Sequence, residues 1–266
     1  MTAIAVTIAG SDSGGGAGIQ ADLKAFSARG VYGASVLTAL TAQNTLGVTA
    51  IHDVPEDFVR AQMDAVYSDL AVNATKIGML SVPATIKAVS AGLKAHATGP
   101  VVLDPVMVAA SGDPLLVSEA VSTLVEELFP LADVITPNLH EAAHILGTDA
   151  ADSEDAMRDQ AHRLIEMGAR AVLLKGGHGS GAECADLLLS ASGERWFRAP
   201  RHETTNTHGT GCTLSSTIAA ELAKGSPLET AVEVAKSYIT DAIAAADTLD
   251  IGKGHGPVHH FHAFWR

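Results

Sequence analysis

Short apolar stretches alternate along this chain with longer segments whose apolar residues recur every three or four positions. The short stretches are rich in Ala, Val, Ile and Leu, which is typical of strands buried on both faces of a sheet. They lie at 3–9, 34–41, 74–80 and 101–107 and in the first halves of 133–141 and 171–178. The longer segments predict helices, among them one with Leu214, Ile218 and Leu222 on one face. This alternation predicts an α/β fold, with helices on both faces of a mostly parallel sheet.

Residues that start or stop helices stand at the boundaries of these segments. Gly30 and Gly168 follow helical segments and are typical helix ends. Ser153 and Asn138 can accept hydrogen bonds from the first turns of the helices that follow them. Further helix starts are predicted at Asp53 with Pro55, at Ser81 with Pro83, and at Pro227. Segments 184–190 and 194–198 predict a strand pair that turns at Ser192 and Gly193.

Composition narrows the class of protein. The 266 residues are 47% hydrophobic and 18% charged, which describes a folded globular chain, and we expect a single domain over 1–266. The net charge of −13 argues against nucleic acid or an anionic membrane as partner. Two cysteines make no disulfide framework, and no apolar run approaches the roughly 20 residues of a membrane helix. We therefore expect a cytoplasmic protein.

A glycine-rich turn from Gly10 to Gly18 follows the first predicted strand. Gly16, Gly18 and Ala21 fit the G-x-G-x-x-A pattern of dinucleotide-binding proteins. That pattern requires an acidic residue about 20 positions further on, where this chain has the apolar stretch 36–40. The turn also lacks the Gly-Lys-Ser/Thr ending of a P-loop. It therefore predicts only a loop where a ligand can approach the backbone closely.

The segment 206–215, Asn-Thr-His-Gly-Thr-Gly-Cys-Thr-Leu-Ser, places two glycines directly before a predicted helix. Glycine lets successive N–H groups point into one concavity, and the helix start adds unpaired N–H groups and the positive end of the helix dipole. These features predict an anion-binding pocket, for phosphate above all. Cys212 lies at its edge, where a helix N-terminus lowers the pKa of a thiol and favours a base or nucleophile. A small buried apolar residue is the alternative interpretation of Cys212.

Polar residues follow several predicted strands, at the edge where parallel α/β sheets bind ligands. Gln43 can donate and accept at once, which suits a heteroaromatic ring, or it satisfies a loop. Asp104 either caps the next loop or holds a metal-bound phosphate, and Lys175 either meets a phosphate or is solvated. Glu141, with Thr136, either places Mg²⁺ or closes a capping box at the start of its helix.

Two further features carry less chemistry. The C-terminal tail has four histidines within eight residues, at 255, 259, 260 and 262. They share no helix or hairpin spacing and no cysteine accompanies them, so we do not expect a zinc site. Cys184 lies in the middle of a predicted strand with no basic or glycine-rich neighbourhood, and we expect it to be structural.

Eight segments in chain order resemble the hydroxymethylpyrimidine/phosphomethylpyrimidine kinase family of the thiamin pathway. They are 9–22, 41–45, 76–80, 104–107, 136–138 with Glu141, 175–178, 207–215 and the Gly-His-Gly-Pro of the tail. Because they span nearly the whole chain, the resemblance is more specific than any single motif. It implies the vitamin-kinase branch of the ribokinase-like fold, with a central mostly parallel sheet flanked by helices.

The resemblance also implies an activity and a set of site residues. The activity is ATP-dependent phosphorylation, with Mg²⁺, of 4-amino-5-hydroxymethyl-2-methylpyrimidine and then of its monophosphate. The implied substrate-binding residues are Gln43, Gly10, Asp22 and Val106. The implied anion hole is Gly209, Thr210 and Gly211, with Cys212 as the base near the hydroxymethyl group. The implied nucleotide-binding residues are Lys175 and Thr210, and the implied Mg²⁺ residues are Asp104, Thr136 and Glu141.

Ala110 and His140 depart from the side chains common in the family, and neither change removes a catalytic group. A pyridoxal/pyridoxine kinase, which shares the fold, the cysteine-bearing loop and the reaction, is the main alternative. A catalytically silent ligand-binding regulator is the other, and the intact Gly-Thr-Gly-Cys loop argues against it. The resemblance further implies a homodimer that acts on small molecules.

Overall fold

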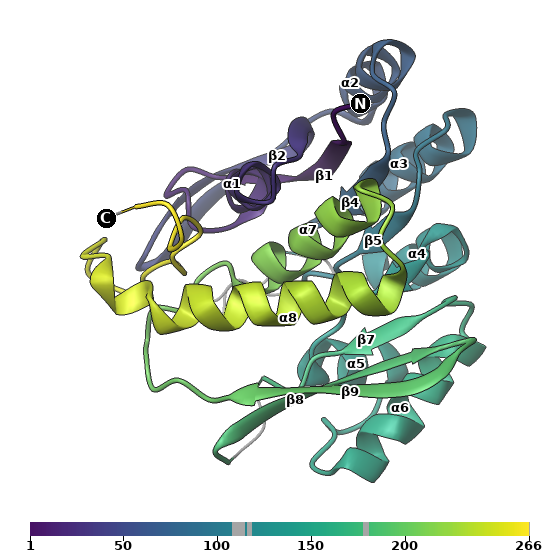
Figure 1. The fold of residues 1–266 in the computed structure, drawn as a ribbon. Helices are drawn as coiled ribbons and strands as arrows, with labels where there is room; N and C mark the ends of the chain where they lie inside the picture. Colours follow the sequence, from purple (N-terminus) through teal and green to yellow (C-terminus); the bar gives the residue numbers. More distant parts are fainter. Residues whose placement is uncertain (108–114, 116–118, 178–180, 266) are drawn as a thin grey trace.

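The computed structural model describes residues 1–107, 115, 119–177 and 181–265, and within them one nine-stranded sheet forms the centre of the molecule (Figure 1). The sheet order is β3-β2-β1-β4-β5-β6-β7-β8-β9. The strands are β1 (Ile4–Asp12), β2 (Tyr32–Asn44), β3 (Gly47–Asp53), β4 (Ala74–Ile77), β5 (Val101–Leu103), β6 (Val134–Ile135), β7 (Val172–Leu174), β8 (Glu183–Ser190) and β9 (Gly193–Pro200). The run from β2 to β7 is parallel, and β3, β8 and β9 are antiparallel to their neighbours. The predicted mostly parallel sheet is confirmed.

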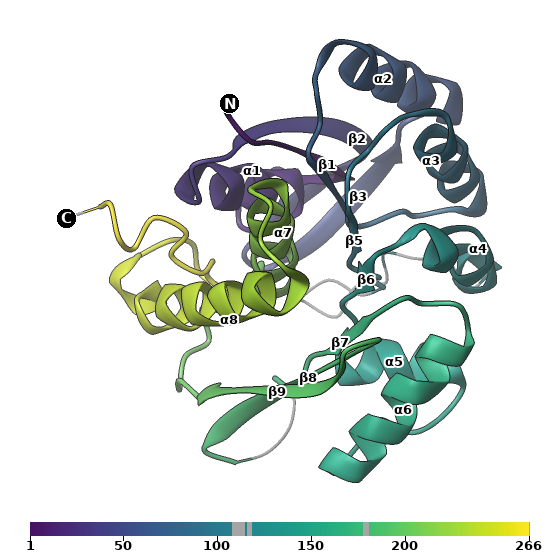
Figure 2. The same ribbon diagram turned by 45° about the vertical axis from the view of Figure 1, so that its right-hand side comes forward.

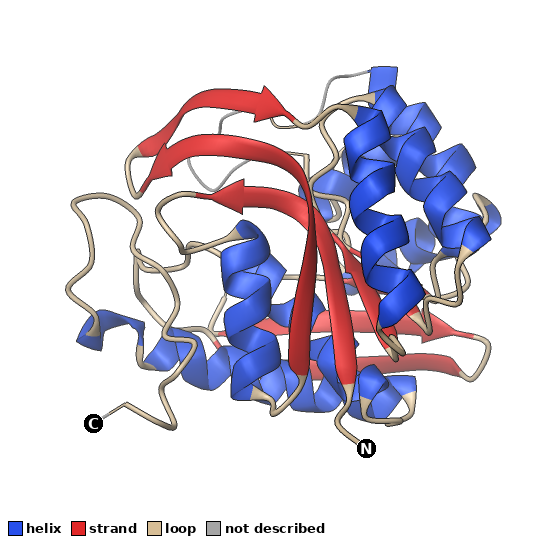
Figure 3. Cartoon of the chain, turned by 90° about the horizontal axis from the view of Figure 1, so that it is seen from above, coloured by secondary structure: helices blue, strands red, loops and turns tan. Residues whose placement is uncertain are grey.

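Helices cover both faces of the sheet (Figures 2 and 3). One face carries α2 (Glu56–Asp69), α3 (Pro83–Ala95), α4 (Glu119–Leu128), α5 (Leu139–Leu146) and α6 (Glu154–Glu166). The other face carries α1 (Gly18–Ala28), α7 (Thr210–Ala223) and α8 (Leu228–Ala244). Two 3₁₀ turns, Phe129–Leu131 and Ala246–Thr248, complete the described helical elements. Within the described residues, none of the helices combines the length and apolar character needed to cross a bilayer.

The two helical layers explain why the parallel strands are mostly apolar. In β5, Val101 and Leu103 pack into the core beneath α2 to α6, whereas Val102 packs into the core beneath α1, α7 and α8. The same alternation places Val172 and Leu174 of β7 on the first face. Successive side chains of a strand point to opposite faces, so a strand covered on both sides is mostly apolar, and the polar side chains within it, such as Thr7 and Lys76, need buried partners.

Most of the predicted helix boundaries are confirmed. Ser153 is the N-cap of α6, and its side chain accepts a hydrogen bond from the N–H of Ala156 at 3.2 Å. Asn138 and Glu141 form a reciprocal capping box at the start of α5. Gly30 has a left-handed φ of 73°, which a residue with a Cβ rarely adopts, directly after the end of α1.

Several predicted boundaries differ from the structure, and one of them is the helix start at Asp53, which ends β3, whereas Pro55 is the N-cap of α2. The second strand extends to Asn44 and folds back as β3, a hairpin that the sequence did not predict, because the side chains of β3 are mostly exposed and carry no apolar pattern. The fifth strand ends at Leu103 and not at Met107. Ser81 does not cap α3, since Val82 occupies the N-cap position and no side-chain cap forms there.

A completely buried ion pair joins α1 to the centre of the sheet. The Lys76 ammonium on β4 lies 3.0 and 2.9 Å from the two carboxylate oxygens of Asp22 on α1, and both side chains have no exposed surface. The Asp22 carboxylate also accepts hydrogen bonds from the hydroxyls of Thr7 and Ser216, each at 2.6 Å. One carboxylate thus connects β1, β4, α1 and α7 behind the carboxyl edge of the sheet.

Replacing Lys76 alone should be more damaging than replacing the whole pair. Lys76→Met leaves Asp22 charged and buried without its cation, so we expect the free energy of unfolding to fall by about 3–5 kcal/mol. The double variant Asp22→Asn/Lys76→Met removes both charges and keeps an amide for Thr7 and Ser216, so it should recover most of that loss. Urea unfolding of the three proteins measures both differences. A double variant no more stable than Lys76→Met would contradict this account.

Candidate active site

The carboxyl ends of the parallel strands bring the predicted site residues together. Asp104 follows β5, and its Oδ1 accepts hydrogen bonds from Lys175 Nζ after β7, at 2.9 Å, and from Thr136 Oγ1 after β6, at 3.0 Å. Its Oδ2 accepts a weaker hydrogen bond, at 3.3 Å, from Ser215 Oγ in α7. Neighbouring parallel strands end at one edge, which is where open α/β sheets bind ligands.

The Gly-Thr-Gly-Cys segment forms the N-terminus of α7 at this edge. Gly209 is the N-cap residue with φ 81°, and its carbonyl accepts the N–H of Thr213 at 2.9 Å. The N–H groups of Gly211 and Cys212 belong to the first turn and therefore have no acceptor within the helix. A Cβ added to Gly211 would lie 3.3 Å from Lys175 Nζ and 3.5 Å from Asp104 Oδ2. Backbone donors, the helix dipole and an ammonium thus converge on one place, which suits an anion.

One close contact joins the two glycine loops at this helix start, and a second closes the first loop on itself. A Cβ on Gly209 would lie 1.9 Å from the carbonyl oxygen of Gly16, and a Cβ on Gly18 would lie 2.4 Å from that of Gly10. Gly209 and Gly18 also have left-handed φ angles. Glycine is therefore required here for close backbone approach as well as for conformation. The predicted loop where a ligand approaches the backbone lies directly against the predicted anion-binding loop.

The pKa of the Cys212 thiol is raised, whereas its place at a helix N-terminus predicted a lowered pKa. Burial raises its pKa to about 11, the Asp22 and Asp104 carboxylates act in the same direction, and Lys76 and the N–H of Gly18 oppose them. The helix N-terminus is thus outweighed by the low-polarity surroundings of the sulfur and by nearby negative charge. At neutral pH the ligand-free site holds a protonated thiol.

Asp104 and its charged neighbours shift one another's pKa values. Burial alone would raise the pKa of Asp104, but Lys175 and Lys76 lower it below its ordinary value, so it is a carboxylate. Burial would lower the pKa of Lys175, but Asp104 and Glu141 raise it, so it is an ammonium. Burial raises the pKa of Glu141 to about 7, against the opposing effect of Lys175, and the negative charge of Asp104 adds to the rise. Asp104 and Glu141 thus share the nearby ammonium of Lys175, so one of the two carboxyl groups has no cation of its own.

Both interpretations of Glu141 find support in this geometry. Its Oε2 accepts the N–H of Asn138 at 2.7 Å, which confirms the capping box. The negative charge of Asp104 contributes to the raised pKa of Glu141, so a cation between the two carboxyl groups would favour the ionised form of Glu141. Within the described ranges, no group of three or more His, Cys, Asp or Glu side chains converges on one metal position. The pair fits Mg²⁺ that keeps several waters and phosphate oxygens, since Mg²⁺ usually binds proteins through one or two carboxylates.

Stability should depend on pH through Glu141. A pKa raised from 4.5 to about 7 means that the folded chain keeps a proton that the unfolded chain releases, so this contribution to stability is present below pH 4.5 and is lost as the pH rises through 7. Glu141→Gln keeps the cap and removes the titration, so its stability relative to wild type should rise from pH 4.5 to 8 by at most about 3 kcal/mol. Urea unfolding across this range measures the change.

Glu166→Gln at the exposed end of α6 is the matched control for loss of a carboxyl group outside the site. If the difference in stability between Glu141→Gln and wild type does not change between pH 4.5 and 8, the account above is wrong.

At the other end of the anion loop, an aspartate and a histidine that sequence reasoning did not single out lie beside Gln43. The Asp12 carboxylate accepts the N–H groups of Gly14, Gly16 and Ala17 at 2.8 to 3.0 Å, and His208 Nε2 lies 2.8 Å from its Oδ2. The same ring nitrogen lies 3.4 Å from Gln43 Nε2. Two signals could have identified the pair: an acidic residue within the glycine turn, and a histidine directly before Gly209.

The remaining predicted residues are placed as follows. Gly10 is buried, and a Cβ added to it would lie 3.1 Å from the sulfur of Met79. Val106 is half-buried in the loop after β5. The Thr210 hydroxyl donates to the carbonyl of Thr207 at 2.6 Å, so its hydrogen is already used within the loop.

The expectation that Asp22 contacts substrate is corrected. Its carboxylate has no exposed surface, because Lys76, Thr7 and Ser216 surround both oxygens. His140 is exposed in the first turn of α5, whereas Ala110 and His178 lie outside the described residues.

The histidine-rich tail packs behind the anion loop. The backbone N–H of His208 donates to the carbonyl of Gly256 at 3.0 Å, and the backbone carbonyl of His208 accepts the N–H of Val258 at 3.2 Å. His260 Nε2 lies 3.0 Å from the Thr213 hydroxyl in α7, and burial lowers the pKa of His260 to about 3, so the ring is neutral. The tail therefore supports the start of α7 through uncharged contacts.

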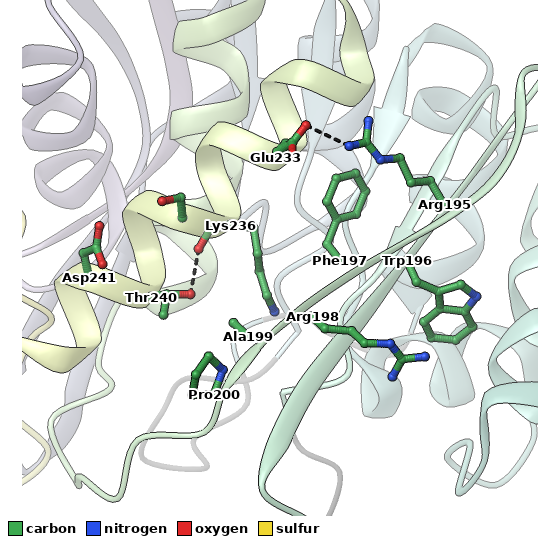
Figure 4. A pocket seen from close by; sticks show the side chains of 11 residues that line it. Arg195, Trp196, Phe197, Arg198, Ala199, Pro200, Glu233, Lys236, Thr240 and Asp241 are labelled. Carbon is green, nitrogen blue, oxygen red and sulfur yellow. Dashed lines mark hydrogen bonds and ion pairs between the residues drawn. The ribbon is translucent and has the colours of Figure 1, made fainter.

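A second concavity lies between β9 and α8 (Figure 4). Its volume is about 380 Å³, and Arg195, Phe197 and Lys236 are among its lining residues. Its cationic side chains are already paired: Arg195 with Glu233 at 2.8 Å, Arg198 with Glu154 at 2.6 Å, and Lys236 with Asp186 at 2.6 Å. None of its lining residues belongs to the motifs described above, so we do not assign the catalytic site to it.

Comparison with known proteins identifies the family. The family model described as phosphomethylpyrimidine kinase matches residues 12–259. The chain belongs to this family. A curated relative from Rhizobium meliloti, named hydroxymethylpyrimidine/phosphomethylpyrimidine kinase, is 60% identical over 100% of both chains. The solved phosphomethylpyrimidine kinase from Clostridium difficile is 44% identical, with a TM-score of 0.80 over 90% of this chain and 99% of that one.

A pyridoxal kinase has nearly the same fold. The Bacillus subtilis pyridoxal kinase, solved as an ADP complex, is 36% identical with a TM-score of 0.91 over 100% of both chains. The resemblance seen in the sequence and the ribokinase-like fold that it implied are thus confirmed. The overall fold therefore does not distinguish the two kinds of kinase, and the distinction depends on the residues that bind the ring of the substrate.

Proposed function

We propose that this protein is an ATP-dependent kinase that phosphorylates 4-amino-5-hydroxymethyl-2-methylpyrimidine and then its monophosphate in thiamin biosynthesis. Membership of the phosphomethylpyrimidine kinase family supports this activity. The observation that carries the proposal is the arrangement at one sheet edge: the N-terminus of α7 adjoins the Lys175–Asp104 pair on one side and Gln43, through His208, on the other. A phosphate-binding end and a ring-binding end are therefore adjacent.

The residues can stabilise phosphoryl transfer mainly by position and charge. The transition state is loose, and negative charge spreads over the equatorial oxygens of the transferred group. The first-turn N–H groups of α7 at Gly211 and Cys212 point towards this charge without reorganisation, and Lys175 supplies a fixed positive charge beside them. Such preorganised donors are usually the largest contribution to catalysis. Lys175 and the backbone at Thr210 would meet the nucleotide phosphates.

Asp104 and Glu141 would hold Mg²⁺, through water or directly, and Thr136 would orient Asp104 by the hydrogen bond it donates. The metal supplies neutralisation of phosphate charge when it is bound. Lys175 already occupies one oxygen of Asp104, so the chain keeps this carboxylate ionised for the metal.

Cys212 is the proposed acceptor of the hydroxymethyl proton. Its raised pKa makes the thiolate a strong base but a scarce one at neutral pH. The first phosphorylation, in which an alcohol loses its proton, should therefore depend on Cys212. The second phosphorylation uses an ionised phosphate as nucleophile and needs no such base.

Cys212→Ala should lower turnover of the alcohol about 10²–10⁴-fold, and turnover of the monophosphate far less. Because the thiolate fraction grows with pH up to about 11, the wild-type rate for the alcohol should rise from pH 7 to 9, and Cys212→Ala should lose that rise. Steady-state kinetics with each acceptor measures both effects, and calorimetry should show ATP binding nearly unchanged.

Cys184→Ala in β8 is the control for loss of a thiol, and it should leave both steps unaltered. Equal losses in the two steps for Cys212→Ala would contradict the base assignment and leave Cys212 as a contributor to the anion site only.

Pyridoxal kinase is the second candidate, because a pyridoxal kinase shares this fold with a TM-score of 0.91. Steady-state assays with ATP and Mg²⁺ should give a kcat/KM for the aminopyrimidine alcohol and for its monophosphate that exceeds the values for pyridoxal and pyridoxine. A preference for pyridoxal would replace the proposed function with the alternative.

We further propose a single domain over 1–266 and a cytoplasmic homodimer. The described residues share one sheet, and the two cysteines are unpaired, which suits a reducing compartment. The exposed apolar side chains Leu40 and Ile51 on the β2–β3 hairpin favour burial against a second copy. Sedimentation of the purified chain at several concentrations tests the dimer, and a monomer throughout would exclude it.

A further inference from the structure

Part of the C-terminal tail connects the β2–β3 hairpin to the segment that leads into the anion loop. This part, residues 252–258, is called the C-terminal strap here, and it belongs to the yellow tail of Figure 1. Gln43 lies two positions before Thr45 in the hairpin, and the anion loop begins at Gly209. The strap therefore joins the two segments whose separation decides where a ring lies relative to a phosphate.

At its first end, the strap is bonded to Thr45 in the hairpin turn. The Thr45 hydroxyl accepts the N–H groups of Lys253 and Gly254, at 3.1 and 3.2 Å, and the Thr45 carbonyl accepts the N–H of His255 at 2.9 Å. A Cβ added to Gly254 would lie 2.1 Å from that carbonyl oxygen, and a Cβ added to Gly252 would lie 2.2 Å from the hydroxyl oxygen. Glycine is therefore required for the strap to lie this close to the hairpin.

At its second end, the strap is bonded to residues 206–208. The N–H of Gly256 donates to Asn206 Oδ1 at 3.1 Å, and the carbonyl of Gly256 accepts the N–H of His208 at 3.0 Å. The N–H of Val258 donates to the carbonyl of His208 at 3.2 Å. A Cβ added to Gly256 would lie 2.2 Å from Asn206 Oδ1. These bonds fix the register of the strap directly before the anion loop.

The direct contact between the ring end and the phosphate end is long. The Gln43 carboxamide lies 3.4 Å from His208 Nε2, beyond the usual length of a hydrogen bond. Ser13 binds the backbone of Gln43 through its hydroxyl, at 2.7 and 2.8 Å, but Ser13 belongs to the loop after β1. The strap supplies shorter bonds from the hairpin turn to residues 206–208, so it fixes a separation that the Gln43–His208 contact leaves loose.

We propose that Thr45 and the glycines of the C-terminal strap are positioning residues that fix the distance between the acceptor ring at Gln43 and the phosphoryl group at the anion loop. This inference rests on the proposed function, in which the hydroxymethyl oxygen attacks that phosphoryl group. The reacting atoms have to lie about 3–3.5 Å apart, and a misplacement of about 1 Å lowers the rate about 100-fold. The strap acts on this distance through the two segments that it joins.

The two acceptors should respond differently to a change in this distance. The alcohol attacks with an oxygen that is one carbon away from the ring. The monophosphate attacks with an oxygen that lies one phosphorus–oxygen unit farther out and can rotate about more bonds. Because the longer arm compensates for a small displacement and the shorter arm does not, loosening the strap should slow the first phosphorylation more than the second.

Thr45→Val keeps the shape of the side chain and removes the hydroxyl that accepts two N–H groups of the strap. It should lower kcat for the alcohol about tenfold and kcat for the monophosphate less than about threefold, with KM for ATP changed less than about twofold. Thr45→Ser keeps the hydroxyl and should restore most of the ratio of the two kcat values. A smaller folded fraction would lower both kcat values equally and leave their ratio unaltered.

Gly254→Ala perturbs the strap independently of the threonine. Gly254 has no left-handed φ, so alanine fits its conformation, but the added Cβ pushes the strap away from the Thr45 carbonyl. Its kcat for the alcohol should fall about 100-fold, again more than its kcat for the monophosphate. Both variants should keep the rise of the alcohol rate from pH 7 to 9, which separates their effect from loss of the Cys212 base.

Thr49→Val is the matched control on the same hairpin, because the Thr49 hydroxyl donates to the carbonyl of Ala42 and not to the strap, and it should behave as wild type. Hydrogen exchange followed by NMR gives a readout without activity. The amides of Lys253 and Gly254 should exchange faster in Thr45→Val than in wild type, and the amide of Val258 should not.

A folded Thr45→Val with an unaltered ratio of the two kcat values would overturn the inference. Failure of Thr45→Ser to restore the ratio would do the same, as would unchanged exchange at Lys253 and Gly254. If the wild type phosphorylates neither acceptor, the proposed function fails separately, and the exchange experiment still decides whether Thr45 holds the strap.

Discussion

The close contact between two backbones is the constraint on which the site depends. Gly209 lies against Gly16, and Gly18 against Gly10, at distances that leave no room for a Cβ. The first contact brings the loop after β1 against the N-terminus of α7, two elements about 190 residues apart in the chain, and the second closes the loop after β1 on itself. The buried Asp12 carboxylate accepts three N–H groups of the loop after β1. It thereby fixes the conformation of the loop against which the N-terminus of α7 packs.

Buried charge sets the chemistry of the same edge. Two carboxylates have close cations, Asp22 with Lys76 and Asp104 with Lys175, and their charges largely cancel at short range. Glu141 is the excess acid, and its raised pKa records the cost of adding a further negative charge to a buried site. A site of this kind binds a cation and a phosphate together more readily than either alone, because each relieves the charge left by the other.

The sequence predicted what depends on local pattern. Mostly apolar strands, the capping box at Asn138 and the helix that begins after Gly209 all follow from rules that act within a few residues. It did not predict what depends on long-range packing. The pKa of the Cys212 thiol is raised because distant segments bury it, and the carboxylate of Asp22 is enclosed by side chains from β1, β4 and α7.

Shared fold and separate specificity have different physical sources in this protein. We propose that the backbone N–H groups of the anion loop bind only the phosphate, and a loop of this kind can serve any alcohol that is placed beside it. Its geometry is compatible with a pyridoxal kinase of 36% identity and a TM-score of 0.91. A ring, in contrast, is distinguished by which edge atoms donate and which accept. Gln43, whose carboxamide can donate and accept, is the side chain that we propose contacts the ring edge, and it can rotate without moving any element of the fold. On this proposal, selection between vitamin rings depends on the side chains beside the anion loop and not on the path of the backbone.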